Sequence, residues 1–300
     1  MPTSIEAILI PTLMICFGYI LKRKSFFKKS DRELLVKIVF YISLPAMIFI
    51  NLSKANISHD MVLLPILSFI TSLFLIVIAY AYCKIRKYSK KTTWTIVIAS
   101  SIMNTGFIGF PVCLSVFGNE GFINAVFFDM ATTAMVVIYG VFLSKEFGGD
   151  GKEVVKNIIT FIPLWAVLFA IIFNIFSIPI PYVADKIINY LGQATIPLIM
   201  LCMGISLEFK EIGKNLSDSI VVSVIKLVAS PAIIFVLLGL FHVKGIAFNV
   251  GVLEAGMSTA MNGLVLAGIY DLDEDLMASL IFTNVILSIF TLTAIISFLT

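Results

Sequence analysis

Polar side chains and helix-breaking residues occur together in the middle of two long apolar stretches. The first stretch, Ser100 to Pro111, reads SSIMNTGFIGFP, and the second, Glu254 to Gly268, reads EAGMSTAMNGLVLAG. Proline removes a backbone hydrogen bond and glycine weakens a helix, so both stretches are predicted to be interrupted helices. An interruption frees N–H donors that can bind an anion and oxygen atoms that can coordinate a cation. We therefore expect a binding site where the two stretches meet.

These polar and helix-breaking residues divide into two expected roles. Contact with a substrate, and with a carboxylate group in particular, is expected from residues at or beside the interruptions: Asn104, Thr105, Gly106, Pro111, Ser258, Thr259 and Asn262. Binding of a coupling ion is expected from two carboxylates within apolar segments, Glu254 and Asp129, together with Thr133. An ionisable group inside a membrane costs at least roughly 2.5–3.5 kcal/mol, so it usually has a partner or a function. Thr133 follows Asp129 by four residues and shares its helical face.

Two cations fit this set of side chains. Sodium prefers hard oxygen donors, which five residues provide: Asn104, Thr105, Asp129, Thr133 and Glu254. Alternatively, Glu254 or Asp129 takes up and releases a proton, because an apolar environment favours the neutral form of a carboxyl group. The sequence leaves the choice between Na⁺ and H⁺ open.

A third ionisable residue, Lys226, lies within the apolar sequence SVIKLVASP. We expect it to balance charge near the site, although it can instead pair with Glu254 or extend to the membrane surface. The interruptions also have a simpler explanation, in which proline kinks one helix and the polar side chains only bond to neighbouring helices. The presence of two such stretches in one chain favours a binding site.

The composition is that of an integral membrane protein. Of the 300 residues, 60% are hydrophobic and 13% are charged, against roughly 45–50% and 25% in soluble domains. The net charge of +3 therefore does not indicate a nucleic-acid partner, and the lipid bilayer is the expected environment. The four cysteines have no paired spacing, and no nucleotide-binding loop, catalytic triad or zinc motif occurs. The sequence thus predicts neither an enzyme nor a cofactor other than the coupling ion.

Ten apolar segments approach or exceed the roughly 20 residues needed to cross a bilayer. They are Ser4–Leu21, Leu34–Ser53, Met61–Ile85, Trp94–Phe117, Phe122–Leu143, Asn157–Ser177, Val183–Leu207, Ser217–Phe241, Ile246–Tyr270 and Leu276–Leu299. Pro45 and Pro197 occupy similar places in the second and seventh segments, which indicates an internal repeat. Because each half has an odd number of segments, the second copy enters the membrane from the opposite side.

The expected fold class is an all-α membrane protein with ten transmembrane helices and two inverted five-helix repeats. Residues 1–147 form the first repeat, residues 148–156 a cytoplasmic linker, and residues 157–300 the second repeat. Helices four and nine are the expected broken crossover helices.

The basic residues predict the orientation of the chain in the cell membrane. Seventeen of the 21 Lys and Arg residues fall in or beside the loops that follow odd-numbered segments. The loops on the opposite side contain only Lys54, Lys186 and Lys244. Because basic loops tend to remain in the cytoplasm, both termini of this multi-pass protein are predicted to lie outside.

Several motifs along nearly the whole chain resemble those of the auxin efflux carrier family. They are GYILKRKSFFKKSDRELLVKIVFYISLPAMIF near the N-terminus, NTGFIGFP with the following GNEG, IPLIMLCMGISL, KLVASP and MSTAMNGLVLAGIYDLD. The resemblance implies ten helices in two inverted repeats, a fold similar to that of bile acid:sodium symporters, and a homodimer. Family members move small organic anions such as auxin, malate or malonate by secondary transport. Ser258 stands where family members often have proline, and the EAGM sequence at Glu254 resembles a sodium-binding motif of the bile acid symporters.

The expected function is secondary active transport of a small organic anion by alternating access, coupled to sodium or protons. One alternative is sodium-coupled transport of a larger organic anion, as in the bile acid symporters. A channel would use the same polar interruption as a selectivity filter, and a receptor or scaffold would leave it unoccupied.

Overall fold

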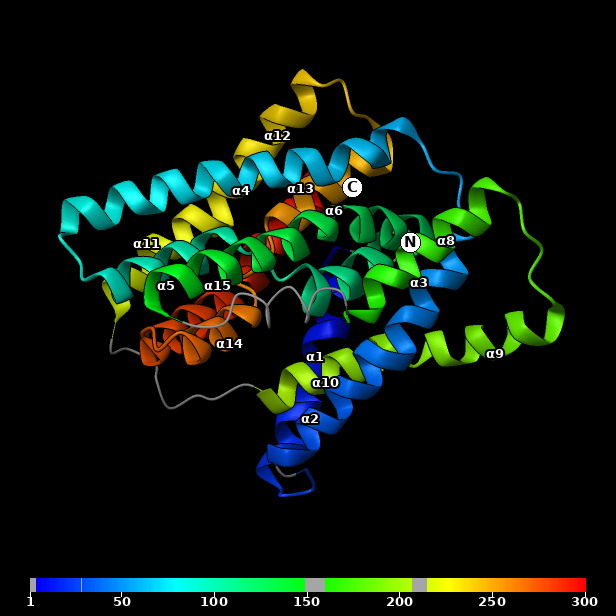
Figure 1. The fold of residues 1–300 in the computed structure, drawn as a ribbon, viewed down its shortest axis with the longest axis horizontal. Coiled ribbons are helices and arrows are strands. Elements are labelled where there is room, and N and C mark those ends of the chain that lie inside the picture. Colours follow the sequence, from blue (N-terminus) through cyan, green and yellow to red (C-terminus); the bar gives the residue numbers. More distant parts are fainter. Residues whose placement is uncertain (1–3, 28, 149–159, 207–214) are drawn as a thin grey trace.

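The computed structural model describes residues 4–27, 29–148, 160–206 and 215–300, and these are almost entirely helical (Figure 1). The α-helices are α1 (Ser4–Arg23), α2 (Lys29–Ile38), α3 (Leu44–Leu52), α4 (His59–Arg86), α5 (Lys90–Ser101), α6 (Phe110–Phe147), α8 (Ile162–Ile175), α9 (Tyr182–Gln193), α10 (Thr195–Ser206), α11 (Leu216–Val224), α12 (Ser230–Leu240), α13 (Gly245–Ala255), α14 (Asn262–Ile269) and α15 (Glu274–Leu299). Three π-helical turns join some of them: η1 (Val39–Ser43), η2 (Thr105–Gly109) and η4 (Ile225–Ala229). The predicted linker beyond residue 148 and the predicted segment ends Asn157 and Leu207 lie outside the described residues.

Within the described residues, six helical stretches are long and apolar enough to cross a membrane. They are Asp31–Leu52, His59–Arg86, Thr105–Phe147, Tyr182–Ser206, Leu216–Leu240 and Glu274–Leu299. Two shorter apolar helices, α8 and α13, accompany them. The chain is therefore an all-helical, multi-pass membrane protein, as its composition predicts.

Helix α6 contains a sharp change of direction at Gly118. Its backbone angles, φ 64° and ψ −157°, are not helical and are readily accessible only to glycine. This glycine lies within the FGNEG sequence, which separates the predicted fourth and fifth segments. The predicted boundary is thus a kink between two helical parts.

Each of the three π-helical turns in the described residues ends two residues before a proline. The prolines are Pro45 after η1, Pro111 after η2 and Pro231 after η4. In each case the residue before the proline donates its N–H to a carbonyl five residues back, as Phe110 does to Thr105. Proline has no N–H and its ring crowds the carbonyl four residues earlier, so a wider turn accommodates it. The prolines of the sequence therefore fix where these membrane helices deviate from α geometry.

The helices form two groups that lie side by side (Figure 1). In one group, α4 packs against α5, α6 and α13, while α11 packs against α15. In the other, α1 packs against α10, and α3 against α8 and α9. The first group contains both interrupted stretches, and the second covers one side of it through contacts of α1 and α3 with α6.

Candidate functional site

The two interrupted stretches cross and pair through their backbones. Helix α5 ends at Ser101, and the chain is not helical again until Thr105; helix α13 ends at Ala255, and α14 begins at Asn262. The non-helical segments form an antiparallel bridge between Met103 and Thr259. This confirms the prediction that both stretches are interrupted, including the second, which has no proline.

Two backbone hydrogen bonds close this crossing. The N–H of Asn104 donates to the carbonyl of Ser258 at 2.9 Å, and the N–H of Ala260 donates to the carbonyl of Ile102 at 3.2 Å. Backbone groups that leave a helix inside a bilayer must find partners within the protein. Each interruption supplies those partners to the other, so neither is expected to be stable alone.

The side chain of Thr259 holds the crossing to the end of α5. Its hydroxyl donates to the carbonyl of Ala99 at 2.7 Å, and the side chain is fully buried. Thr259 was predicted to contact a substrate, but it is not among the residues that line the neighbouring cavity. The structure gives it a role in joining the two stretches.

Replacing Thr259 with valine should therefore destabilise the protein by about 1–3 kcal/mol, because a buried acceptor loses its donor. Thermal unfolding in detergent measures this change. Thr293 provides the matched control, since its hydroxyl donates at 2.7 Å to Ile289 within one continuous helix. An equal loss in Thr293→Val would show that the crossing has no special dependence on the Thr259 hydroxyl.

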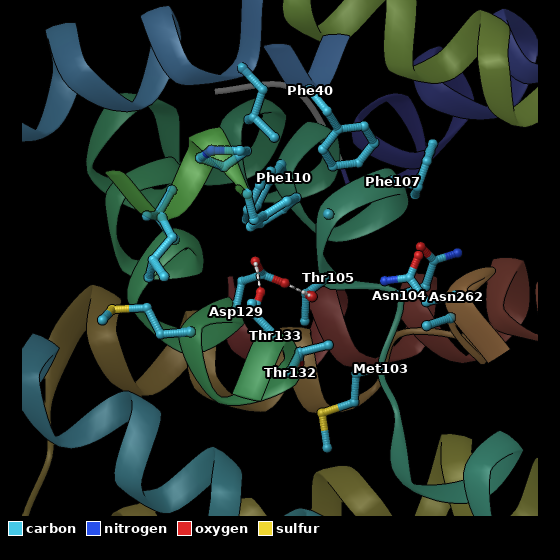
Figure 2. A pocket seen from close by; sticks show the side chains of 18 of the residues that line it. Phe40, Met103, Asn104, Thr105, Phe107, Phe110, Asp129, Thr132, Thr133 and Asn262 are labelled. Carbon is cyan, nitrogen blue, oxygen red and sulfur yellow. Dashed lines mark hydrogen bonds between the residues drawn. The ribbon is translucent and has the colours of Figure 1, made fainter. Parts of the chain in front are cut away.

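A cavity of about 130 Å³ lies beside the crossing (Figure 2). Its polar lining comes from Asn104, Thr105, Asp129, Thr132, Thr133 and Asn262. Its aromatic lining comes from Phe40, Phe107, Phe110 and Phe161. Of the described residues that line it, Asp129 is the only charged one. Five of the polar residues predicted from the sequence therefore line one cavity.

Asp129 connects helix α6 to the interruption of the first stretch. Its carboxylate accepts a hydrogen bond from the hydroxyl of Thr105, at the start of η2, and another at 3.4 Å from Thr133 (Figure 2). Thr133 lies one helical turn along α6, as predicted from its spacing. Three oxygen-bearing side chains therefore face one another at the wall of the cavity, where a cation would have hard ligands.

Two amide side chains also line the cavity, Asn104 at the end of the first interruption and Asn262 at the start of α14. The side-chain nitrogen of Asn104 is buried and has no hydrogen-bond partner among the described residues. Asn262 starts α14 and its side chain is exposed to the cavity (Figure 2). The first N–H groups of a helix lack intrahelical partners and carry partial positive charge. At the start of α14 the N–H groups of Gly263 and Leu264 already donate to Ala260 and Met261, so the donor without a partner here is the Asn104 amide nitrogen.

Glu254 lies near the crossing but does not line the cavity. Its side chain is fully buried, and one oxygen accepts a hydrogen bond from the Cys113 thiol at 3.3 Å. The other oxygen has no partner among the described residues. A methyl group added at Gly109 would overlap the carboxylate, so the last residue of η2 packs directly against it. The turn η2 therefore contacts both carboxylates, Asp129 through Thr105 and Glu254 through Gly109.

Lys226 is fully buried on the turn η4. Its ammonium group has no hydrogen-bond partner among the described residues, and it forms no ion pair with Glu254 there. Its burial also excludes the alternative in which the side chain reaches the membrane surface. Lys226 is not among the residues that line the cavity beside the crossing.

The other predicted substrate residues have different positions. Gly106 lines the cavity, whereas Pro111 and Ser258 do not. Pro111 lies in the first turn of α6, and Ser258 contributes its carbonyl to the crossing.

The aromatic walls were not predicted from the sequence. Phe107 and Phe110 belong to the NTGFIGF sequence, in which they follow Thr105 by two and five residues. Phe40 and Phe161 come from distant segments, and the rings of Phe40 and Phe161 lie 6.0 Å apart. Nothing in their local sequence distinguishes them from the other phenylalanines of the chain.

A second cavity, of about 260 Å³, extends from the first along α6 and α14. The two cavities share Thr133, Phe161 and Asn262. The remaining lining of the second cavity is mostly aliphatic, and Tyr270 lies among it. A partly polar cavity thus adjoins a larger and more apolar one.

Comparison with known proteins identifies the family to which this chain is similar. A family model described as membrane transport protein matches residues 3–160 and 151–296. An uncharacterized transporter of Methanothermobacter thermautotrophicus is 37% identical over 291 residues, covering 96% of each chain. Another uncharacterized transporter, of Methanocaldococcus jannaschii, is 34% identical over 293 residues, covering 95% of each chain.

These relatives are transporters and not enzymes, in agreement with the absence of catalytic motifs from the sequence. The matches together span nearly the whole chain, including both interrupted stretches and the cavity between them. The chain therefore belongs to this family of membrane transport proteins, the auxin efflux carrier family that its motifs resemble.

Proposed function

We propose that the protein is a secondary active transporter that moves a small organic anion by alternating access. The observation that carries this proposal is the backbone pairing of two interrupted helices beside a cavity lined by Asn104 and Asn262. Interrupted membrane helices are tolerated where they line a binding site, and their N-termini suit anionic groups.

The proposed fold consists of ten transmembrane helices in two inverted repeats, residues 1–147 and 157–300, with the linker 148–156 in the cytoplasm. The similar construction of the two halves supports this fold, because each half contributes one interrupted helix and the two meet at the crossing. The distribution of basic residues supports a cell-membrane protein with both termini outside. The group of helices that includes α1, α3, α8, α9 and α10 would serve as the panel against which the other group moves, and as the surface of a homodimer.

The proposed substrate carries a carboxylate group that faces the two amides and the starts of η2 and α14. Malate, malonate and auxin are examples of the class. The cavity of about 130 Å³ is smaller than the roughly 300–1,000 Å³ of sites for drug-sized ligands, which favours a small anion. The second, apolar cavity favours the alternative of a larger anion with a hydrophobic body, as in the bile acid symporters.

The proposed coupling ion is Na⁺ or H⁺, bound where Asp129, Thr105 and Thr133 meet. A carboxylate in the same cavity repels an anion strongly, because the repulsion between two like charges grows as their separation and the local dielectric constant decrease. A cation or proton on Asp129 removes this repulsion, so the cation and the anion would bind together. Asn104 and Glu254 are the further oxygen ligands proposed for sodium, while Lys226 is proposed to balance charge within the same helical group.

Replacing Asp129 with asparagine should uncouple transport from the ion gradient. The variant keeps a side chain that can bond to Thr105 and Thr133 but has no negative charge to neutralise. Anion exchange should persist in proteoliposomes, whereas a gradient of sodium or protons should no longer drive accumulation.

Two other variants make this result specific. Glu120 is exposed near the kink of α6, so Glu120→Gln should leave coupling unchanged. Glu254→Gln tests whether the second carboxylate also contributes, and loss of coupling there with folding retained would place it in the mechanism. Full gradient-driven accumulation by Asp129→Asn would refute the assignment of Asp129.

Counterflow in proteoliposomes tests the proposed function itself. Vesicles loaded with an unlabelled carboxylate should transiently concentrate the labelled compound, with saturation at high concentration. A channel would instead show conductance without saturation at low concentration, and a scaffold would show neither. The compound to use can be found by thermal-stability screening, because a ligand that binds only the folded state raises its stability.

A further inference from the structure

A basic pocket is present where the ends of three membrane helices meet. The C-terminal ends of α4 and α6 and the N-terminal end of α5 surround a cavity of about 610 Å³. The turn between α4 and α5 lies at the left edge of Figure 1, away from the crossing of the interrupted helices. Because membrane-length helices end here, the pocket lies at the level of one bilayer surface.

The outer part of the pocket carries excess positive charge. Lys84, Lys87 and Lys90 line it, together with the single acid Glu146. Lys90 forms an ion pair with Glu146, whereas Lys84 and Lys87 have no acidic partner among the described residues. Two positive charges at the mouth of one cavity therefore have no carboxylate partner in this part of the structure, and the Lys84 ammonium lies 5.5 Å from the centroid of the Tyr80 ring.

The conformation of the chain fixes the position of Lys87. This residue ends α4 with a left-handed backbone, φ 57°, and its N–H donates to the carbonyls of Cys83 and Lys84. Glycine is usually preferred at such a position because a side chain adds strain. A lysine is retained here, and its side chain joins that of Lys84 at the same cavity.

An aromatic layer lies one helical turn deeper on each of the three helices. Tyr80 precedes Lys84 by four residues on α4, Trp94 follows Lys90 by four on α5, and Phe142 precedes Glu146 by four on α6. One turn of an α-helix is about 5.4 Å. The ring centroids of Tyr80 and Trp94 are 6.1 Å apart, and those of Trp94 and Phe142 are 4.5 Å apart. The pocket therefore changes from cationic to aromatic in the direction of the bilayer.

We propose that this pocket binds the phosphate headgroup of an anionic phospholipid. The phosphodiester would lie between Lys84 and Lys87, and the glycerol and first acyl carbons would pack on the rings of Tyr80, Trp94 and Phe142. Basic pockets between membrane helices bind anionic headgroups, and Trp and Tyr prefer the depth at which the acyl chains begin. This inference is independent of the transported substrate, since none of these residues lines either cavity at the crossing.

Quenching of Trp94 fluorescence by brominated lipids tests the proposal. The protein contains two tryptophans, so Trp165→Phe leaves Trp94 as the reporter in the full chain. Dibrominated phosphatidylglycerol should quench Trp94 saturably and at a lower mole fraction than dibrominated phosphatidylcholine. Lys84→Gln with Lys87→Gln should raise the required mole fraction about thirtyfold, because each lysine near an anionic surface contributes about 1 kcal/mol and 1.4 kcal/mol is tenfold.

Two matched double variants separate the pocket from overall charge. Lys24→Gln with Lys145→Gln removes the same amount of charge from exposed positions outside the pocket. In this variant Trp94 should be quenched as in the parent. Lys84→Arg with Lys87→Arg keeps the charge, so Trp94 should again be quenched as in the parent. Equal quenching of Trp94 by the two lipids would overturn the proposal. So would a Lys84→Gln, Lys87→Gln variant in which quenching requires the same mole fraction of lipid as in the parent. Displacement of the brominated lipid by soluble glycerol phosphate would also overturn it, since it would assign the pocket to a soluble organophosphate.

Discussion

Replacing Asn104 with alanine is expected to weaken binding of the transported anion about ten- to hundredfold. A hydrogen bond to a charged group contributes roughly 1.5–3 kcal/mol, and 1.4 kcal/mol corresponds to a factor of ten. The Asn104 side-chain nitrogen is buried without a partner in the described structure, so its removal leaves no other group unsatisfied. Stability should therefore change little while binding and counterflow fall. Thermal-shift titration with the transported carboxylate measures both quantities in one experiment.

Asn284 is the matched control for this substitution. It is also a fully buried asparagine, but its nitrogen donates to the carbonyl of Leu280 within α15, and it does not line either cavity at the crossing. Asn284→Ala should leave the affinity unchanged. If Asn104→Ala binds the anion as tightly as the parent protein, the amide is not part of the binding site.

The second large effect is expected from Gly109→Ala. The added methyl group would overlap the carboxylate of Glu254, which is fully buried and bonded to Cys113 and so has little room to move. Overpacking of this kind typically costs about 1–3 kcal/mol. The strain should also displace η2, whose other end positions Thr105 against Asp129. We expect a lower unfolding temperature together with at least a tenfold loss of transport.

Gly106 provides an internal control within the same turn. A methyl group added there meets no atom within 4 Å, so Gly106→Ala should leave the unfolding temperature close to that of the parent. A double-mutant cycle makes the cause explicit, because Glu254→Ala removes the overlapping atoms and should recover part of the stability lost in Gly109→Ala. Strictly additive effects of the two substitutions would show that the contact does not cause the loss.

The interruptions of the membrane helices were predictable because their causes are local. Pro111 lacks an N–H, glycines weaken the helix, and Asn104 needs partners inside the bilayer. The same reasoning located the second interruption without a proline, from the glycines and polar residues around Ser258. The boundary at Gly118 was likewise predictable, because glycine readily adopts backbone angles that other residues disfavour, such as those observed here.

Which polar residues line the cavity and which join the two stretches was not predictable from local sequence. Thr259 and Asn262 are three residues apart in one polar stretch, yet Thr259 bonds to α5 while Asn262 lines the cavity. Their roles depend on which face of the chain meets the other stretch after crossing. Burial of Lys226 without an ion pair in the described residues is likewise a consequence of the packing of α11, η4 and α12 against other helices.

The aromatic walls show the same limit on a larger scale. Phe40 and Phe161 are more than 100 residues apart, and they meet only because the turn η1 packs against α8. Hydrophobic residues are the background of a membrane protein, so their type and spacing carry little information about a site. The polar half of the site could be predicted because polar groups are rare and costly in the bilayer, whereas its apolar half could not.

Thiol labelling of Thr132→Cys tests the central claim, that the cavity beside the crossing is a transport site open to each side in turn. Thr132 lines this cavity, and serine would replace the four native cysteines, Cys16, Cys83, Cys113 and Cys202. In reconstituted vesicles, a membrane-impermeant thiol reagent should reach the new cysteine from either side, and a saturating carboxylate that stabilises the protein should slow the reaction. Labelling from one side only, or at a rate unaffected by that carboxylate, would contradict the account.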